Sequence, residues 1–269
     1  SWTTEDKLQI YAVDWSVEQA RAAVGIIHGL GEHVHRYEHV AKYFNDRQIA
    51  VTGYDRRGHG RSDGQRGHTK SYGLLLDEIG QLLTETESRY PGLPLFLYGH
   101  SMGGNLLLNY LIKRNPNIQG AIVSAPHIQL SFKPSAVMVA LGKLMRNLVP
   151  GFSQANGLAV DQLSRDPQVV AAYHADPLVH NKLSASLGMA MLESGEWLHT
   201  YRGTLKVPLL LMHGGADGIT SPEATQAFAK RVRGEITCKI WDGLYHEIHN
   251  EPEQEQVLQF AYDWMLAHM

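Results

Sequence analysis

The hydrophobic and polar positions of this chain follow two patterns that alternate along its length. Short, mostly apolar runs are typical of strands that are covered on both faces of a sheet. Such runs occur at residues 20–27, 49–54, 95–98, 120–124, 207–212 and 237–241. Between them, apolar residues three to four positions apart predict amphipathic helices, as at residues 71–90. Strands that alternate with helices indicate an α/β protein with a mainly parallel sheet, and residues 8–15 alternate like an edge strand.

This rhythm changes between residues 125 and 206. About eighty residues without a clear strand are too many for a loop in a compact domain, and their apolar periodicity predicts several inserted helices. We therefore expect a core domain made of residues 1–126 and 206–269, with an inserted helical cap, or lid, at residues 127–205.

The length and charge of the chain narrow the classes of protein to consider. A chain of 269 residues is long enough for one large core with an inserted segment. Its net charge of -3, with basic and acidic residues intermixed, gives no field that would attract nucleic acid, so we expect no nucleic-acid partner. Four arginines do cluster, but they share their segment with Asp55 and Asp63, so we interpret them as local structure. They are Arg56, Arg57, Arg61 and Arg66.

The single cysteine, Cys238, excludes an internal disulfide and a cysteine-based zinc site. No apolar run reaches about 18 residues, the length that a membrane-spanning helix needs. The first residues, SWTTEDKL, lack the charged-then-apolar layout of a signal peptide. These features together predict a cytoplasmic protein, and they do not predict its oligomeric state.

Residues 95–105 (LFLYGHSMGGN) combine a buried strand, a sharp turn and the start of a helix around one serine. Residues 99–103 match G-x-S-x-G, in which the glycines leave room for a nucleophile at a strained turn between strand and helix. The helix after the turn points its amino end, with free NH groups, at the same place. We therefore predict that Ser101 is a nucleophile.

A serine nucleophile needs a base to accept its proton and an acid to hold that base, and in this fold class they follow the serine in the order acid, then histidine. The strand at 207–212 is followed by Asp217, and the loop after the last predicted strand holds His246. His213 precedes the acid and is out of order, and His249 is expected near the start of the last helix. The predicted triad is Ser101, Asp217 and His246.

The oxyanion of acyl transfer needs preorganised donors, each worth about 3 kcal/mol. One donor is the backbone NH of Met102, the residue after the nucleophile, and the other is expected from residues 28–31 (HGLG), at Leu30. A dinucleotide site is excluded because Val34 stands where the third glycine is needed, and no phosphate-binding loop motif occurs.

A metal site is the remaining alternative. His35 and His39 lie four positions apart, but no H-E-x-x-H motif and no third ligand accompany them. We expect no metal and no cofactor, and we expect these two histidines to be exposed helix residues.

The sequence resembles the monoacylglycerol lipases of the serine α/β-hydrolase fold over nearly its whole length. The core motifs that carry the resemblance are residues 28–33 (HGLGEH) with 36–37 (RY), 55–62 (DRRGHGRS), 90–94 (YPGLP) and 99–104 (GHSMGG). The more specific matches lie in the cap, at residues 163–166 (LSRD) and 173–178 (YHADPL).

The resemblance implies a mainly parallel eight-stranded sheet flanked by helices, the same triad, and an oxyanion hole made by Leu30 and Met102. It also places Glu32, Arg36 and Tyr173 near the substrate, with Tyr173 at the pocket for the glycerol part. The implied activity is hydrolysis of a monoacylglycerol to glycerol and a free fatty acid, with a small lipid as the partner.

Residues 135–149 form an apolar stripe with basic flanks at Lys133, Lys143 and Arg146. We predict a mobile lid whose apolar face makes transient contact with a membrane surface and admits one acyl chain. The alternative is that the stripe only packs the cap onto the core. Its members are Met138, Leu141, Leu144, Met145 and Leu148.

Other functions remain open at this point. A broad carboxylesterase or a lysophospholipase would share the catalytic motifs, and an aminopeptidase would need cap carboxylates, such as Glu193 or Glu196, to hold a free amine. A non-catalytic binding protein on the same fold would typically lack a triad member.

Overall fold

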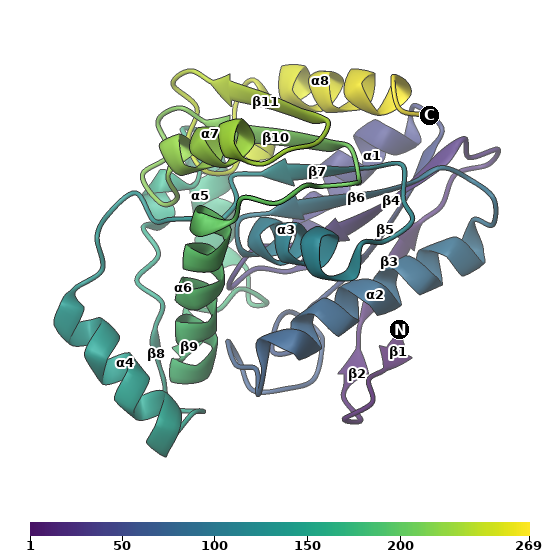
Figure 1. Cartoon of the computed structure of the whole chain (residues 1–269). Coiled ribbons are helices and arrows are strands. Elements are labelled where there is room, and N and C mark those ends of the chain that lie inside the picture. The colour runs from purple at the N-terminus through teal and green to yellow at the C-terminus, as the bar shows by residue number, and fades with distance from the viewer.

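The computed structural model describes all 269 residues of the chain (Figure 1). Its strands are β1 (Trp2–Thr3), β2 (Gln9–Ile10), β3 (Ala12–Trp15), β4 (Ala22–Ile27), β5 (Ile49–Tyr54), β6 (Leu95–His100), β7 (Gly120–Ser124), β8 (Ser153–Ala155), β9 (Lys182–Ser184), β10 (Leu209–Gly214) and β11 (Ile236–Trp241). Its helices are α1 (Glu38–Asn45), α2 (Tyr72–Arg89), α3 (Met102–Arg114), α4 (Ala136–Leu148), α5 (Pro167–Ala175), α6 (Ala185–Thr200), α7 (Pro222–Arg231) and α8 (Gln254–Leu266). Short 3₁₀ turns lie at Val34–Tyr37, Val160–Gln162 and Ile248–Asn250.

Seven strands form the main sheet, in the order β11-β10-β7-β6-β4-β5-β3. Only β3 runs antiparallel to its neighbour. The apolar runs predicted as strands are therefore strands, and β4, β5, β6, β7 and β10 are buried along their whole length. Because parallel strands all end at one edge, the loops after β4, β6 and β10 gather there.

Two apolar layers hold the helices on the sheet. One layer joins α1 and α8 to one face, and the other joins α2, α3 and α7 to the opposite face. The predicted helix at 71–90 is α2: the side chain of Ser71 accepts the Leu74 NH at its start, and the chain turns at residues 91–92 after its end. None of the helices combines the length and the apolar character that crossing a bilayer requires.

The eight strands that the resemblance implies are one too many, because the sheet has seven. The segment predicted as one edge strand at residues 8–15 is also divided. Only β3 joins the sheet, while β2 pairs with β1 as a separate hairpin. The backbone NH groups of Gln9 and Tyr11 donate to the side chains of Asp63 and Ser62, at 2.9 Å each. Those side chains occupy the positions that a continuous strand pairing would have used.

Residues 127–205 lie in the chain between β7 and β10, which are neighbours in the sheet. We call them the inserted segment. It contains α4, α5 and α6, and also the antiparallel strand pair β8–β9, which the hydrophobic pattern did not reveal. The helix α6 packs on α3 of the core, and α4 packs on α6 (Figure 1). The prediction that His35 and His39 are exposed is also wrong, since both are half-buried and hydrogen-bonded, to Tyr11 and to the carbonyl of His249.

Candidate active site

Ser101 sits at the turn between β6 and α3 in a strained backbone conformation, with φ 56° and ψ -116°. The two glycines of the motif allow the surrounding chain to pack against this turn. A Cβ at Gly99 would lie 2.7 Å from the carbonyl oxygen of Gly103, and a Cβ at Gly103 would lie 2.1 Å from that of Ile27. Any side chain at these positions would push α3 away from the ends of β6 and β4.

The three residues predicted as a triad meet at this edge of the sheet. Nε2 of His246 lies 2.9 Å from Ser101 Oγ, and Nδ1 of the same ring lies 2.7 Å from Oδ2 of Asp217. Asp217 and His246 are buried. The order hydroxyl, imidazole, carboxylate is the arrangement that nucleophilic acyl transfer requires.

The Asp217 carboxylate is surrounded by donors. Its Oδ1 accepts the NH groups of Ile219 at 2.7 Å and Thr220 at 3.0 Å, and Nε2 of His213 lies 2.9 Å from Oδ2. Burial raises the pKa of Asp217, but the charge of His246 and the hydrogen bonds from both histidines lower this pKa well below its usual range. The acid is therefore ionised at neutral pH and can orient the base.

The His246 imidazole has a raised pKa. Burial, the largest single effect, lowers the pKa, but the charge and the hydrogen bond of Asp217, with smaller contributions from Glu247 and Glu32, together raise it. The loop that carries His246 is held by the inserted segment, because the NH groups of His246 and Glu247 donate to the carbonyls of Gln162 and Leu163 at 3.3 and 2.8 Å. We call residues 162–165 the brace.

The two backbone NH groups predicted as oxyanion donors belong to Met102 and Leu30. Met102 is the first residue of α3, where NH groups have no partner within the helix. The loop that carries Leu30 lies beside the serine, since a Cβ at Gly29 would lie 3.4 Å from that of Ser101. The Leu30 NH donates to no acceptor in the protein. Both groups are free to bind an oxyanion.

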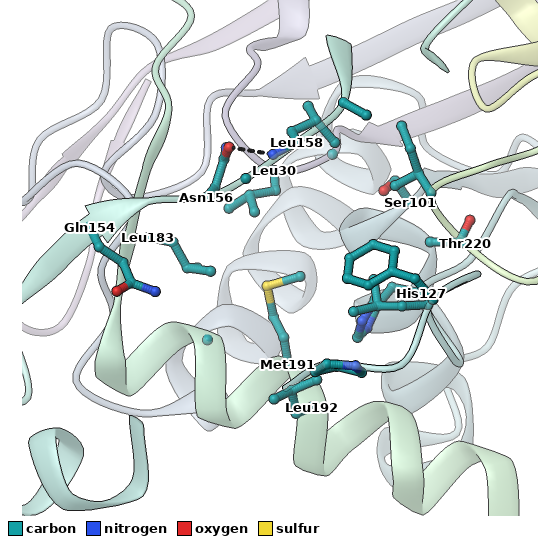
Figure 2. Close-up of a pocket in the computed structure, with 18 of the residues that line it drawn as sticks. Leu30, Ser101, His127, Gln154, Asn156, Leu158, Leu183, Met191, Leu192 and Thr220 are labelled. Atoms are coloured by element: carbon teal, nitrogen blue, oxygen red, sulfur yellow. Dashed lines mark hydrogen bonds between the residues drawn. The ribbon is translucent and has the colours of Figure 1, made fainter. Parts of the chain in front are cut away.

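Ser101 opens into a cavity of about 450 Å³, a size common for small-molecule sites. Figure 2 shows Leu30 and Leu158 near Ser101, with Met191 and Leu192 entering from α6 and Leu183 from β9. Gln154 and Asn156 are polar side chains that line the cavity on the side of the β8–β9 strand pair. The cavity is thus an apolar pocket with a reactive group at one wall.

Glu32, Arg36 and Tyr173 are brought together at another wall. The Arg36 guanidinium donates to Glu32 at 2.6 Å and to both carboxylate oxygens of Glu247 at 2.7 and 2.8 Å. The same guanidinium lies 4.8 Å from the centre of the Tyr173 ring. Glu32, Tyr173 and Glu247 line the cavity, whereas Arg36 stands behind them as the common partner of two buried carboxylates.

The five predicted lid residues separate into two groups in the structure. Met138, Leu141 and Met145 line the cavity, whereas Leu144 and Leu148 do not, and their exposed fractions are 53% and 68%. The helix α4 has no buried residue. The stripe therefore faces the cavity on one side and solvent on the other.

Some neighbours of the candidate triad were not found from the sequence. The Thr220 hydroxyl lies 2.9 Å from Oδ2 of Asp217 and 3.3 Å from Nδ1 of His246. A signal was present, since Thr220 follows the acid by three residues in a turn of the Asx type. His213, set aside for its position in the chain, contacts the acid from inside the sheet, and His249 packs on His100 at 4.8 Å between ring centres.

Comparison with known proteins places the chain in a family. Residues 18–253 match the family described as "Serine aminopeptidase, S33". An uncharacterised abhydrolase domain-containing protein of Dictyostelium discoideum is 39% identical over 97% of this chain, which spans only 28% of that protein's length. A monoacylglycerol lipase of Mycolicibacterium smegmatis is 36% identical over 93% of this chain and 89% of its own length.

A solved structure agrees with these sequence matches. The crystal structure of Paleococcus ferrophilus monoacylglycerol lipase superposes with a TM-score of 0.89 at 35% identity, covering 97% of this chain and 100% of that one. The chain is therefore a serine hydrolase of the α/β-hydrolase fold, and it belongs to the serine aminopeptidase S33 family.

Proposed function

We propose that this protein is a lipase that hydrolyses monoacylglycerols to glycerol and a free fatty acid. The observation that carries the proposal is the hydrogen-bonded series Ser101, His246 and Asp217 at the wall of an apolar cavity. The names of the relatives from Mycolicibacterium smegmatis and Paleococcus ferrophilus point to the same substrate class.

The first half of the proposed reaction forms an acyl-enzyme. Nε2 of His246 accepts the proton of Ser101 Oγ as that oxygen attacks the ester carbonyl carbon. The carbonyl oxygen becomes an oxyanion that accepts hydrogen bonds from the NH groups of Leu30 and Met102. The bond between the carbonyl carbon and the glycerol oxygen then breaks, and His246 returns the proton to that oxygen.

The second half releases the fatty acid. Water enters where glycerol left, and His246 accepts one of its protons as the water oxygen attacks the acyl carbon. The bond from Ser101 Oγ to that carbon breaks, and the serine recovers its proton from the imidazole. Asp217 stays ionised throughout and holds the ring in the tautomer with the proton on Nδ1.

The walls of the cavity suit the two ends of such a substrate. We assign the apolar side, formed by α4, α6 and Leu158, to the acyl chain. We assign the polar side, formed by Glu32 and Tyr173 with Arg36 behind them, to the glycerol part. Burial raises the pKa of Tyr173 well above its usual value, so its hydroxyl keeps its proton and can donate to a glycerol oxygen.

An aminopeptidase would need a free carboxylate in the cavity to hold a substrate amine. Glu193 instead accepts two hydrogen bonds from Arg146, each 2.7 Å, and neither Glu193 nor Glu196 lines the cavity. The carboxylates that do line it, Glu32 and Glu247, both bind Arg36. The site therefore favours an uncharged ester over a charged amine.

A substrate panel tests the proposal. It contains mono-, di- and triacylglycerols, a lysophospholipid, short-chain esters and aminoacyl amides, each assayed with the wild-type chain and with Ser101→Ala. We expect monoacylglycerols to give the highest kcat/KM and Ser101→Ala to abolish turnover of all of them. Preference for aminoacyl amides or for the lysophospholipid, or activity that survives in Ser101→Ala, would contradict the proposal.

We further propose that residues 127–205 act as a cap and that α4 is its lid, in transient contact with a membrane. Val137, Leu144 and Leu148 are more than half exposed on this helix, at 75%, 53% and 68%. Lys143 lies beside them, is exposed, and can meet anionic headgroups, whereas Arg146 is paired with Glu193. We place the enzyme in the cytoplasm, which agrees with its single, free cysteine.

Replacing Leu141 and Leu144 with serine tests the lid. We expect vesicle binding and hydrolysis of long-chain substrate to fall, and thermal stability to stay unchanged because both side chains are about half exposed, at 47% and 53%. Leu266→Ser is the matched control, since this leucine is also exposed, at 38%, but at the end of α8. Equal vesicle binding and long-chain activity in the double variant and the control would exclude the lid role.

A further inference from the structure

Arg56 is a fully buried arginine without an acidic partner. Its exposed fraction is 0%, and its guanidinium forms no ion pair with a carboxylate. The next residue, Arg57, is also buried, but it binds Glu78 at 2.5 Å and Asp6 at 3.0 Å. Buried charges are normally paired, so the placement of Arg56 calls for a physical reason.

The partners of Arg56 are two consecutive backbone carbonyls of the loop after β4. Its Nη1 donates to the carbonyl of His28 at 2.7 Å, and its Nη2 donates to the carbonyl of Gly29 at 2.6 Å. The planar fork of a guanidinium suits two such acceptors, and a lysine ammonium could not hold both in the same way. One side chain therefore fixes two adjacent peptide planes.

His28 completes this arrangement. Its Nε2 accepts the backbone NH of Arg56 at 3.0 Å, so the ring proton of the neutral imidazole is on Nδ1. Nδ1 lies 2.8 Å from the carbonyl oxygen of Gly29 and donates to it. Burial and the nearby charge of Arg56 lower the pKa of His28, which keeps the ring neutral. The Gly29 carbonyl thus accepts two hydrogen bonds.

The peptide that joins Gly29 to Leu30 carries the candidate oxyanion donor. In a trans peptide the C=O and the N–H point in opposite directions, so fixing the Gly29 carbonyl fixes the direction of the Leu30 NH. The preceding peptide is held at both ends, since its carbonyl binds Arg56 and its NH donates to Glu32 at 2.5 Å. Among these groups only the Leu30 NH has no partner in the protein.

We propose that Arg56 is a positioning residue of the oxyanion hole, which holds the Gly29–Leu30 peptide so that the Leu30 NH points at the developing oxyanion. Its positive charge at the carbonyl end also polarises the peptide and strengthens the NH as a donor. This inference rests on the proposed function, because it assumes that Ser101 attacks an ester. It changes the interpretation of the arginine cluster: Arg57 is structural, whereas Arg56 serves the reaction.

The test compares Arg56→Met with Arg57→Met. Each variant is assayed for kcat and KM on a soluble short-chain ester, for inhibition by a phenylboronic acid, and for affinity towards an ether analogue of a monoacylglycerol. The boronic acid forms a tetrahedral adduct with a serine oxygen and so needs the oxyanion donors, whereas the ether does not. Thermal melting is measured on both variants.

For Arg56→Met we expect kcat to fall about 10- to 100-fold. This decrease is smaller than, or close to, the one caused by removing an oxyanion donor altogether. The boronate Ki should rise by the same factor, and the affinity for the ether should change less than about twofold, because the substrate in its ground state does not use these donors. Arg57→Met should melt at a lower temperature, since Glu78 and Asp6 lose their partner, but keep kcat and the boronate Ki.

Arg56→Lys is measured as well and replaces the methionine variant if that protein does not fold. A lysine keeps the charge but not the fork, so we expect an intermediate loss of kcat and of boronate affinity. A folded Arg56→Met or Arg56→Lys with wild-type kcat would overturn the inference. A fall in kcat without any change in the boronate Ki would also overturn it.

These outcomes are separable from failure of the proposed function. A wild-type protein that neither hydrolyses esters nor binds the boronate would overturn both proposals. A wild-type protein that does both, together with unchanged Arg56 variants, would overturn only the role of Arg56.

Discussion

The floor and the roof of the cavity are built in opposite ways. We use floor for the strand-end loops that hold Ser101, Leu30, Asp217 and His246, and roof for α4. The side chains of the candidate triad in the floor are hydrogen-bonded and mostly buried, whereas α4 has no buried residue. The contrast teaches that the groups proposed for the reaction are fixed by hydrogen bonds and burial, whereas the helix proposed as the lid has no buried residue.

The attachments of the two regions explain the contrast. The roof is held by packing of α4 on α6, including the close approach of Gly142 to Met189, and by the exposed ion pair of Arg146 with Glu193. Such an ion pair contributes only about 0–1 kcal/mol. The floor is held by the sheet itself and by the brace at residues 162–165. The lid motion proposed above would therefore not have to disturb His246.

The largest effect is expected from a change in the floor that leaves its shape intact. Asp217→Asn keeps the size of the side chain but removes the charge that holds His246 in the tautomer with its proton on Nδ1. We expect kcat on a soluble short-chain ester to fall about 10⁴-fold. Glu193→Gln, which alters a carboxylate near the roof, is the control and should leave kcat within about twofold. A loss of less than tenfold in Asp217→Asn would show that another group orients the base.

Adding one methyl group to a glycine tests how tightly the floor and the roof are packed. Gly103→Ala would place a Cβ 2.1 Å from the backbone carbonyl of Ile27, so β4 and α3 must move apart. We expect the free energy of unfolding, measured with denaturant, to fall by about 1–3 kcal/mol, as it does when a core is overpacked. We also expect kcat to fall.

The same substitution in the roof is the matched control. A Cβ at Gly142 would lie 3.2 Å from the sulfur of Met189, a flexible side chain that can move aside. Because alanine favours a helix over glycine by about 1 kcal/mol, we expect Gly142→Ala to leave stability unchanged or to raise it. Equal destabilisation by the two substitutions would remove the distinction between floor and roof.

The pH dependence of the reaction should belong to the floor alone. A protonated His246 cannot accept the proton of Ser101, so activity is lost at low pH. Because the pKa of His246 is raised above the usual histidine value of 6.5, this loss should begin at a higher pH than for an ordinary histidine. We expect kcat/KM to fall about tenfold per pH unit below that pKa. α4 contributes no titratable side chain to the cavity, so affinity for an ether analogue should stay nearly constant. An acid limb centred below pH 6.5 would contradict the raised pKa.

The features predicted best from the sequence are those that local patterns determine. The buried strands and the elbow at residues 99–103 depend on neighbours in the chain, and so their apolar runs and glycines could be interpreted directly. The family of the chain, predicted by resemblance, is confirmed by the comparisons. The roles of Ser101, Asp217 and His246 remain predictions, which the observed distances support.

Contacts between distant segments were beyond the reach of the sequence. Arg56 was grouped with its neighbours because nothing in the spacing shows that its partners are carbonyls 27 and 28 residues away. The division of residues 8–15 depends on side chains about fifty positions later in the chain. The stripe on α4 was predicted as one face, but its position between a cavity and solvent follows from how α4 sits on α6.

The brace sets limits on how this enzyme could be re-engineered. Grafting a foreign sequence over the whole inserted segment would change the backbone that places the carbonyls of residues 162 and 163 against the His246 loop. A smaller graft avoids this, because the chain is held at both ends of a shorter segment. The Ser131 NH donates to the carbonyl of Ile219, and the Ser186 NH donates to the carbonyl of Pro150. The exchangeable unit is therefore residues 132–149, and chimaeras with those limits could acquire a new substrate range while the catalytic machinery is inherited intact.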